Sequence, residues 1–252
     1  MRLNFFKVFL TTLLLSLAVV SCSTPDPIDV NSAEKAFKEA KEYEDDERYE
    51  EALRRYDEIK NKFPYSQYSK ESDLRIADIY FKKEEFASAA LSYSNFKYLY
   101  PNHPQIPYVS LQLALSYFNQ LPTTIDRDLS KGVQAIQEFN IVLDKYPGTD
   151  FAKTAAEKKK ATQDMLAKKE SYIANWYFKK EKYLSAMRRF ENLTKMPAPA
   201  ELTSEAYLKG AISALEIGEV GKGKSLLEQL SKKFPTSDNN DQISDVKSKY
   251  GI

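Results

Sequence analysis

The residue types that most often perform catalysis are scarce in this sequence, which holds one histidine and one cysteine. His103 stands in Pro101-Asn102-His103-Pro104, and the flanking prolines predict a turn with no second metal ligand or nucleophile nearby. Adjacent carboxylates such as Glu84-Glu85 fall in predicted exposed turns, so they do not form a general acid–base pair. No GxGxxG, Walker or HExxH motif is present. We therefore predict no catalytic residues, no metal site and no cofactor.

The single cysteine, Cys22, has a chemical role that its surroundings specify. Two basic residues and then an apolar run, Val8 to Val20, precede it. The run is too short to span a membrane comfortably, so residues 1–21 read as a secretory signal peptide. Val19-Val20-Ser21-Cys22 resembles the lipobox of bacterial lipoproteins. That resemblance implies a diacylglycerol thioether on Cys22, cleavage before it and acylation of the new N-terminus. The alternative is a soluble secreted protein with a chance cysteine here.

Residues 22–31 contain two prolines and no periodicity, so we interpret them as the lipidated cysteine followed by a flexible tether. Ser23 follows the cysteine where an aspartate tends to hold Gram-negative lipoproteins at the inner membrane. The absence of an aspartate at this position favours the outer membrane, with the protein anchored by lipid and facing the periplasm.

The rest of the chain repeats itself. YFKKEEFASAALSY, Tyr80 to Tyr93, returns as YFKKEKYLSAMRRF, Tyr177 to Phe190. A bulky residue followed by proline closes five segments, and these pairs are Phe63-Pro64, Tyr100-Pro101, Tyr146-Pro147, Met196-Pro197 and Phe234-Pro235. Twelve residues before four of these prolines stands a small residue: Ala52, Ala89, Ala135 or Gly223. Helices approach closely only where small side chains face each other, and proline ends a helix.

This pattern resembles the tetratricopeptide repeat (TPR), a pair of antiparallel helices. The resemblance implies an all-α fold, a right-handed α-solenoid of about five TPR helical hairpins, because fixed-period repeats stack into solenoids. We place repeats 1–3 in residues 32–148, with the insertion PTTIDRDLS in the turn of repeat three. A long linking helix from about Thr149 to Tyr177 and repeats 4–5 occupy 149–237. Ser66, Thr149 and Ser237 are predicted N-caps. The tail, 238–252, is expected to contain a short capping helix at most.

Charge is unevenly distributed along the chain. Removing Arg2 and Lys7 with the signal peptide leaves 35 basic and 36 acidic residues, which argues against a general nucleic-acid binder. Residues 32–51 carry nine acidic and four basic side chains, whereas residues 151–198 carry twelve basic and five acidic ones. Solvated helix faces explain much of this. The asymmetry still favours a partner that docks on the C-terminal half.

Most of the 17 tyrosines and 14 phenylalanines occupy packing positions of the repeat. Four tyrosines fall outside that pattern and flank the turns of repeats one to three: Tyr65, Tyr68, Tyr98 and Tyr108. We expect them to form an exposed aromatic groove that binds a substrate chain, because tyrosine buries a ring while keeping a polar edge hydrated.

The lipobox, the tether, five repeats and a long helix between repeats three and four resemble the BamD family, the lipoproteins of the outer-membrane β-barrel assembly (BAM) machinery. The more specific segments are FPYSQYSKESDLRIADIYFKKEEFASA and YPGTDFAKTAAEKKKATQDMLAKKESYIANWYFKKEKYLSAMRRFENL. The resemblance implies a scaffold with no chemistry of its own. Its N-terminal repeats would receive unfolded outer-membrane protein precursors. Its C-terminal repeats would hold the last POTRA domain of the barrel-forming subunit BamA, beside other BAM lipoproteins.

In that family, an arginine in the second helix of repeat four contributes to the contact with BamA. Arg189-Phe190-Glu191 matches its pattern here, so we expect Arg189, with Lys179 and Lys180, to bind the partner. Two other classes stay open: another TPR lipoprotein of the cell envelope, such as a secretin pilotin or a division coordinator, and an enzyme that uses the repeats as a scaffold. The barrel subunit or a secretin among co-purified proteins would distinguish the first two.

Overall fold

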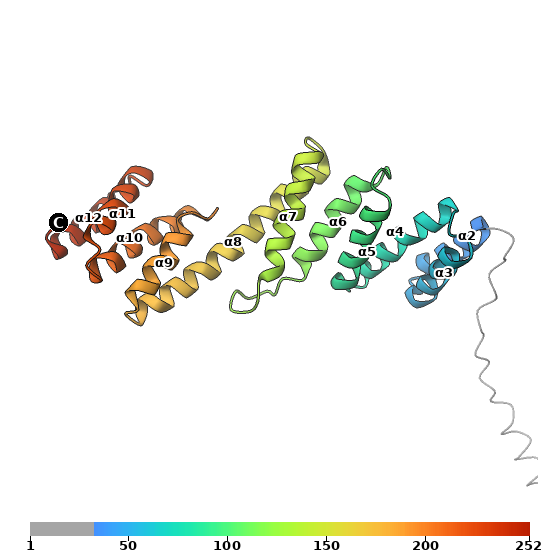
Figure 1. Ribbon diagram of the computed structural model, residues 1–252, viewed down its shortest axis with the longest axis horizontal. Helices are drawn as coiled ribbons and strands as arrows, with labels where there is room; N and C mark the ends of the chain where they lie inside the picture. The colour runs from blue at the N-terminus through green and yellow to red at the C-terminus, as the bar shows by residue number, and fades with distance from the viewer. Residues whose placement is uncertain (1–32) are drawn as a thin grey trace, which may run out of the picture.

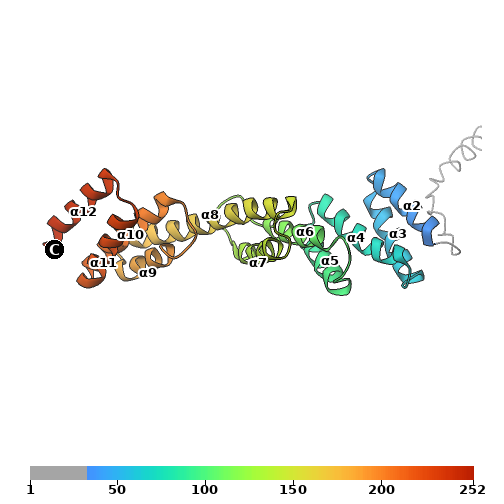
Figure 2. The same cartoon turned by 90° about the horizontal axis from the view of Figure 1, so that it is seen from above.

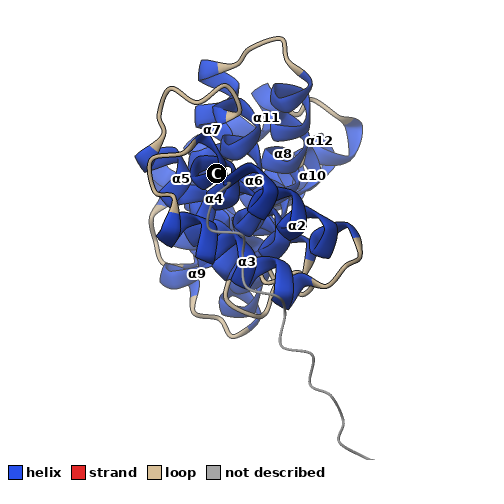
Figure 3. Cartoon of the chain, turned by 90° about the vertical axis from the view of Figure 1, so that its right-hand side faces the viewer, coloured by secondary structure: helices blue, strands red, loops and turns tan. Residues whose placement is uncertain are grey.

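The computed structural model describes residues 33–252, and every regular element in that range is an α-helix (Figure 3). The predicted signal peptide, Cys22 and the tether lie outside the described residues. Five antiparallel helix pairs follow one another along an elongated molecule, and a single helix ends it (Figures 1 and 2). The pairs are α2 (Ala33–Asp45) with α3 (Tyr49–Lys62), α4 (Gln67–Lys82) with α5 (Phe86–Leu99), α6 (Ile106–Asn119) with α7 (Ser130–Lys145), α8 (Asp150–Lys179) with α9 (Tyr183–Leu193), and α10 (Ala200–Glu216) with α11 (Val220–Lys233), followed by α12 (Ser237–Tyr250). The predicted all-α solenoid of five TPR hairpins is confirmed.

Each hairpin closes around a pair of small residues, one on each helix. All of them are buried: Ala40 with Ala52, Ala77 with Ala89, Ala114 with Ala135, Ala174 with Ala186, and Ala211 with Gly223. At the last crossing, a Cβ on Gly223 would lie 2.6 Å from the Leu215 side chain, so a larger residue there would force Leu215 to move. One turn further along, a large side chain fills the space between the helices, and these are Tyr56, Tyr93, Phe139, Phe190 and Leu227.

The turns inside four hairpins share one conformation. Glu47, Glu84, Glu181 and Gly218 have positive φ values of 58°, 59°, 55° and 82°. Each lies five residues before the small residue of the second helix. The left-handed conformation is therefore part of the repeat, and only the fifth hairpin uses glycine, for which this conformation carries no steric penalty. The third hairpin lacks this turn because a longer connection, residues 120–129, which contains most of the insertion, joins the helices instead.

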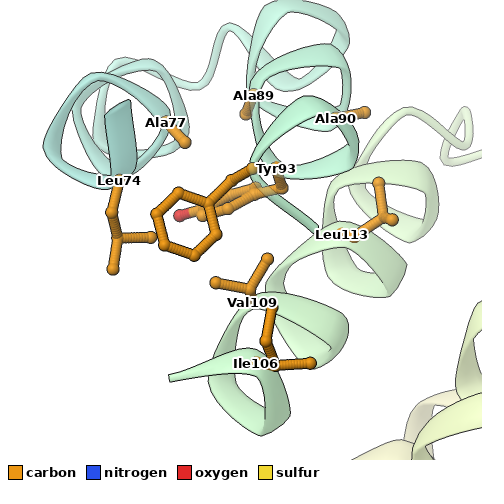
Figure 4. Close-up of a cluster of buried hydrophobic side chains, with 9 residues drawn as sticks. Leu74, Ala77, Ala89, Ala90, Tyr93, Ile106, Val109 and Leu113 are labelled. Carbon is orange, nitrogen blue, oxygen red and sulfur yellow. The ribbon is translucent and has the colours of Figure 1, made fainter. Parts of the chain in front are cut away.

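The core is made of successive clusters that interlock along the solenoid. Figure 4 shows one, in which Tyr93 of α5 lies among side chains of α4 and α6. The first three hairpins are joined this way, since Ile79 of α4 packs into the cluster of α2 and α3. The pattern changes on α8. Ala155 belongs to the cluster of α6 and α7, whereas Ala167 and Ala174 belong to the cluster of α9 and α10. The long helix therefore connects an N-terminal half to a C-terminal half.

Two predictions about helix ends need correction. Side chains of Ser66 and Thr149 cap α4 and α8 as expected, but Thr236, not Ser237, caps α12 by accepting a hydrogen bond from the Asn239 N–H. The tail is also more ordered than expected: α12 has 14 residues, as many as α11. Ile243 and Val246 pack it onto the fifth hairpin, which covers the last apolar face of the solenoid.

Candidate functional site

The residues predicted to bind a partner share the fourth hairpin. Lys179 is the last residue of α8 and Lys180 is its C-cap. Both are exposed, and neither forms an ion pair within residues 33–252. Two cations at the C-terminus of a 30-residue helix are favoured by its dipole. They also leave a positive charge that the described residues do not neutralise.

Arg189 stands on α9, the second helix of the same hairpin. Its neighbour Phe190 is fully buried, as predicted, and Arg188 is exposed. The guanidinium is not free, however: its Nη1 donates hydrogen bonds of 3.0 and 3.3 Å to the two carboxylate oxygens of Glu170. This pair ties α9 to α8. The sequence pattern placed Arg189 at the surface correctly but did not reveal that it has a partner within the chain.

The four tyrosines predicted to form a groove divide into two kinds. Tyr65, in the loop between α3 and α4, is 99% exposed, and Tyr98 on α5 is 85% exposed. They stand on separate elements of the first two hairpins. In contrast, Tyr68 is half-buried with its ring centroid 5.4 Å from that of Phe37. Tyr108 is half-buried and donates a hydrogen bond of 2.8 Å to Asp78 Oδ1.

The prediction of one exposed groove made of all four tyrosines is therefore wrong. Packing between consecutive hairpins covers Tyr68 and Tyr108, although both fall outside the packing pattern of a single hairpin. A shallow hollow does lie at the C-terminal end of α5, close in sequence to Tyr98. Its lining residues are Lys70, Leu99, Tyr100, Pro101, Asn102, His103 and Pro104.

Sequence reasoning missed a buried ionic network that joins the first three hairpins. Glu44 on α2 is almost fully buried and accepts hydrogen bonds from Tyr56 Oη at 3.0 Å, Arg75 Nε at 2.9 Å and Lys82 Nζ at 2.7 Å. Arg75 on α4 also bonds Asp78 at 3.3 Å. Burial would raise the pKa of Glu44, but the hydrogen bonds and charges of Arg75 and Lys82 hold that pKa below its ordinary 4.5.

Asp78, the second carboxylate of the network, accepts hydrogen bonds from Tyr93 Oη at 2.7 Å and Tyr108 Oη at 2.8 Å. Burial raises the pKa of Asp78 above its ordinary 3.8 despite these hydrogen bonds. Burial and the neighbouring Asp78 raise the pKa of Tyr108 to about 12. The carboxylates of this network already accept hydrogen bonds from donors within the chain. The network therefore has a structural role, which is to hold the first three hairpins together.

The described residues contain no cluster of three or more histidine, cysteine, aspartate or glutamate side chains that could hold a metal ion. His103, outside any such cluster, packs edge-on against Phe96 at 5.1 Å. Within residues 33–252, no helix has the length and apolarity needed to cross a bilayer. Fold and site together define a tetratricopeptide-repeat protein with aromatic and cationic side chains exposed on its surface.

Comparison with known proteins specifies that class further. The chain belongs to the YfiO family, described as outer membrane lipoproteins, whose model matches residues 29–207. A tetratricopeptide-repeat model matches residues 205–237, the fifth hairpin. That hairpin departs from the aromatic pattern of the others, yet it is recognised as a repeat.

Curated relatives agree with the family. The chain is 25% identical over 252 residues to outer membrane protein assembly factor BamD of Neisseria meningitidis serogroup A, which covers 92% of each chain. It is 29% identical to the protein of that name from Caulobacter vibrioides, over 74% of this chain and 61% of the relative. Among solved structures, the TPR2AB domain of yeast Sti1 aligns with 85% of this chain and 83% of that one, at 13% identity and a TM-score of 0.45.

Proposed function

We propose that this protein is a non-catalytic scaffold of outer-membrane protein assembly, lipid-anchored through Cys22 to the outer membrane of a Gram-negative bacterium and facing the periplasm. The observation that carries the proposal is the family match across residues 29–207, with assembly factors among its relatives along most of the chain. The repeat solenoid supports it, since stacked repeats create extended binding surfaces.

The C-terminal half would bind the barrel-forming subunit of the assembly machinery, a BamA-type protein. Lys179, Lys180 and Arg189 would provide cationic contacts to a carboxylate-bearing POTRA domain. The Glu170 contact uses only Nη1 of Arg189, so its other N–H donors remain available to a second carboxylate. Glu170 would then orient the guanidinium before the partner arrives.

The N-terminal half would receive unfolded outer-membrane protein precursors. Tyr65 and Tyr98 present exposed rings, and the hollow lined by Tyr100 and His103 offers space for an apolar side chain beside the amine of Lys70. Tyr68 and Tyr108 would act indirectly, by holding the hairpins that present these side chains. The ionic network of Glu44, Arg75 and Asp78 fixes the arrangement of those hairpins.

A pull-down from detergent-solubilised envelopes tests the proposal. The wild-type protein should co-purify with a BamA-type barrel subunit and other BAM lipoproteins. Recovery of a secretin or a division complex in their place would refute it. Cys22→Ser should abolish incorporation of labelled palmitate and shift the protein to the soluble fraction or leave it unprocessed. Equal labelling of mutant and wild type would reject the anchor.

A further inference from the structure

One face of α8 is uncovered where the other hairpins are covered. Three of its residues and its C-cap are spaced four apart and therefore share a side of the helix: Lys168, Tyr172, Trp176 and Lys180. Together with Lys179 they form what we call the junction face. Tyr172 is 56% exposed and Trp176, the only tryptophan in the chain, is 50% exposed.

The equivalent positions in the other hairpins show how this face of the first helix is normally covered. Trp176 lies two residues after the small residue Ala174, and the equivalent residues Ile79, Ser116 and Ser213 are fully buried. Ile79 packs into the core of the preceding hairpin. In α2, which has no described hairpin before it, the equivalent Glu42 is exposed and charged. This register position is therefore normally covered by the previous hairpin.

The position of Tyr172 gives a second indication that this face is normally covered. Its equivalents on α4 and α10 are Arg75 and Lys209, and both reach the first helix of the preceding hairpin. Arg75 bonds Glu44 of α2, and Lys209 Nζ donates to Asn175 Oδ1 of α8 at 2.7 Å. In the fourth hairpin, an aromatic ring replaces this polar link and faces solvent.

The length of α8 explains the gap. It begins 24 residues before Ala174, whereas α4 begins 10 residues before Ala77. Fourteen additional residues move the fourth hairpin about 20 Å along the helix axis, away from the third. Figure 1 shows α6 and α7 beside the first part of α8, and α9 and α10 beside its last part. Gly132 of α7 faces Thr162 and Leu166, before the junction face begins.

We propose that the junction face is a docking site for a protein segment that takes the place of the missing hairpin and presents apolar side chains between carboxylates. Trp and Tyr are the residues that most often dominate such interfaces. The charge on the face selects an acidic occupant, since Lys168, Lys179 and Lys180 have no ion pair within the described residues. The nearby acids Asp164 and Glu170 are already paired with Lys160 and Arg189.

This inference rests on the proposed function in one respect: the occupant belongs to the barrel-forming subunit, to which that function assigns Lys179 and Lys180. A protein fits better than a bilayer, because these positions pack against protein in the other hairpins. Hydroxyl-radical footprinting can decide. Oxidation of Trp176 and Tyr172 would be compared with that of Tyr98 in three samples: the unlipidated chain alone, the same chain with phosphatidylglycerol vesicles, and the complex purified in detergent.

We expect Trp176 and Tyr172 to be protected about tenfold in the complex and not by vesicles. Protection by vesicles alone would assign the face to lipid and overturn the proposal. A complex that forms but leaves Trp176 as reactive as in the isolated chain would also overturn it, while leaving the proposed function intact. If no complex forms at all, the proposed function itself fails.

Variants provide a second test. Trp176→Ala and the double variant Lys168→Glu with Lys180→Glu should each lower recovery of the complex about tenfold. The double replacement of those lysines by arginine should keep it. The matched controls are Val133→Ala and Lys62→Glu, at an exposed apolar side chain and an exposed helix end of the N-terminal half. If the controls and the junction variants reduce recovery equally, the junction face has no specific role. Circular dichroism verifies that each variant is folded.

Discussion

Hairpins one to three and hairpins four and five each share core residues with their neighbours, but the third and fourth hairpins are joined differently. In the N-terminal half, each core cluster includes residues of the next hairpin, and the buried carboxylates Glu44 and Asp78 bind donors from several helices. The C-terminal half connects to the third hairpin through α8, and its core at Ala174 includes no residue of α6 or α7.

Surface chemistry follows the same division. The second hairpin exposes uncharged side chains on α5, including Leu91 and Tyr98, whereas the fourth exposes the cations Lys179, Lys180 and Arg188 together with the rings of Tyr172 and Trp176. The comparison suggests a physical reason for the long helix. Under the proposed function, the helix separates the interlocked unit that would hold an extended chain from the cationic unit that would dock on a folded, acidic partner.

Loss of the Glu44 carboxylate should have the largest effect and should break the interlock of the N-terminal half. Glu44→Ala leaves Tyr56, Arg75 and Lys82 without their buried acceptor. Removing one member of a buried ionic group typically lowers the free energy of unfolding by about 3 kcal/mol or more. Urea denaturation measures this change in the free energy of unfolding. Glu51→Ala is the control, because its pair with Arg48 is solvent-exposed, and its denaturation midpoint should barely move. Equal denaturation midpoints for Glu44→Ala and Glu51→Ala would contradict a stabilising role for the Glu44 network.

Overpacking a helix crossing tests in one experiment whether the two halves are destabilised independently of each other. Ala89→Leu and Ala186→Leu each insert a large side chain at a fully buried crossing, at a cost of about 1–3 kcal/mol. Hydrogen exchange should show that Ala186→Leu lowers protection in α9 and α10 but not in α2 to α5. Glu85→Gln, on an exposed turn, should resemble wild type. Uniform loss of protection along the chain in Ala186→Leu would show that the halves are not separate units.

These small-residue crossings could be predicted from the sequence because the same residue type recurs at a fixed interval along the chain. The networks could not. Glu44 and Arg75 lie 31 residues apart, and Arg189 and Glu170 lie 19 apart, among many other charged side chains. Only the stacking of helices selects these pairs.

Tyr68 and Tyr108 were misjudged for a related reason. The pattern of one hairpin predicts burial within that hairpin, not burial by the next one. The length of α12 was also missed, because only Ile243 and Val246 give its otherwise polar sequence an apolar face.

The turns offer a smaller, matched comparison between the halves. Gly218→Ala places a Cβ on a residue with φ of 82°, which should lower the free energy of unfolding by about 1 kcal/mol. Glu84→Gly removes the same strain from the second hairpin and should change stability by less than about 1 kcal/mol, because glycine also gains entropy in the unfolded chain. Thermal melts measure both. Destabilisation by Glu84→Gly as large as that of Gly218→Ala would show that the turn conformation does not matter.

The smallest effect expected is on the pH dependence of unfolding. Because the folded protein lowers the pKa of Glu44, the stability from this carboxylate is present above pH 4.5 and is lost as the pH falls through its folded pKa. Asp78 acts oppositely: its raised pKa means that acidification through that value, down to pH 3.8, adds stability.

Glu44→Gln should therefore flatten the acid loss of stability below pH 4.5, and Asp78→Asn should steepen the loss above pH 3.8. Urea midpoints across pH 3 to 7 report both slopes. Parallel curves for wild type and the two variants would show that these carboxylates do not contribute to the pH dependence of unfolding.

Site-specific photo-crosslinking in intact cells tests the division of labour most directly. A photoreactive residue would replace Tyr98 in one strain and Lys180 in another, and the crosslinked proteins would be identified by mass spectrometry. The account predicts that position 98 captures unfolded outer-membrane protein precursors and that position 180 captures the barrel-forming subunit. Capture of the same protein from both positions, or of precursors at position 180 and the barrel subunit at position 98, would contradict it.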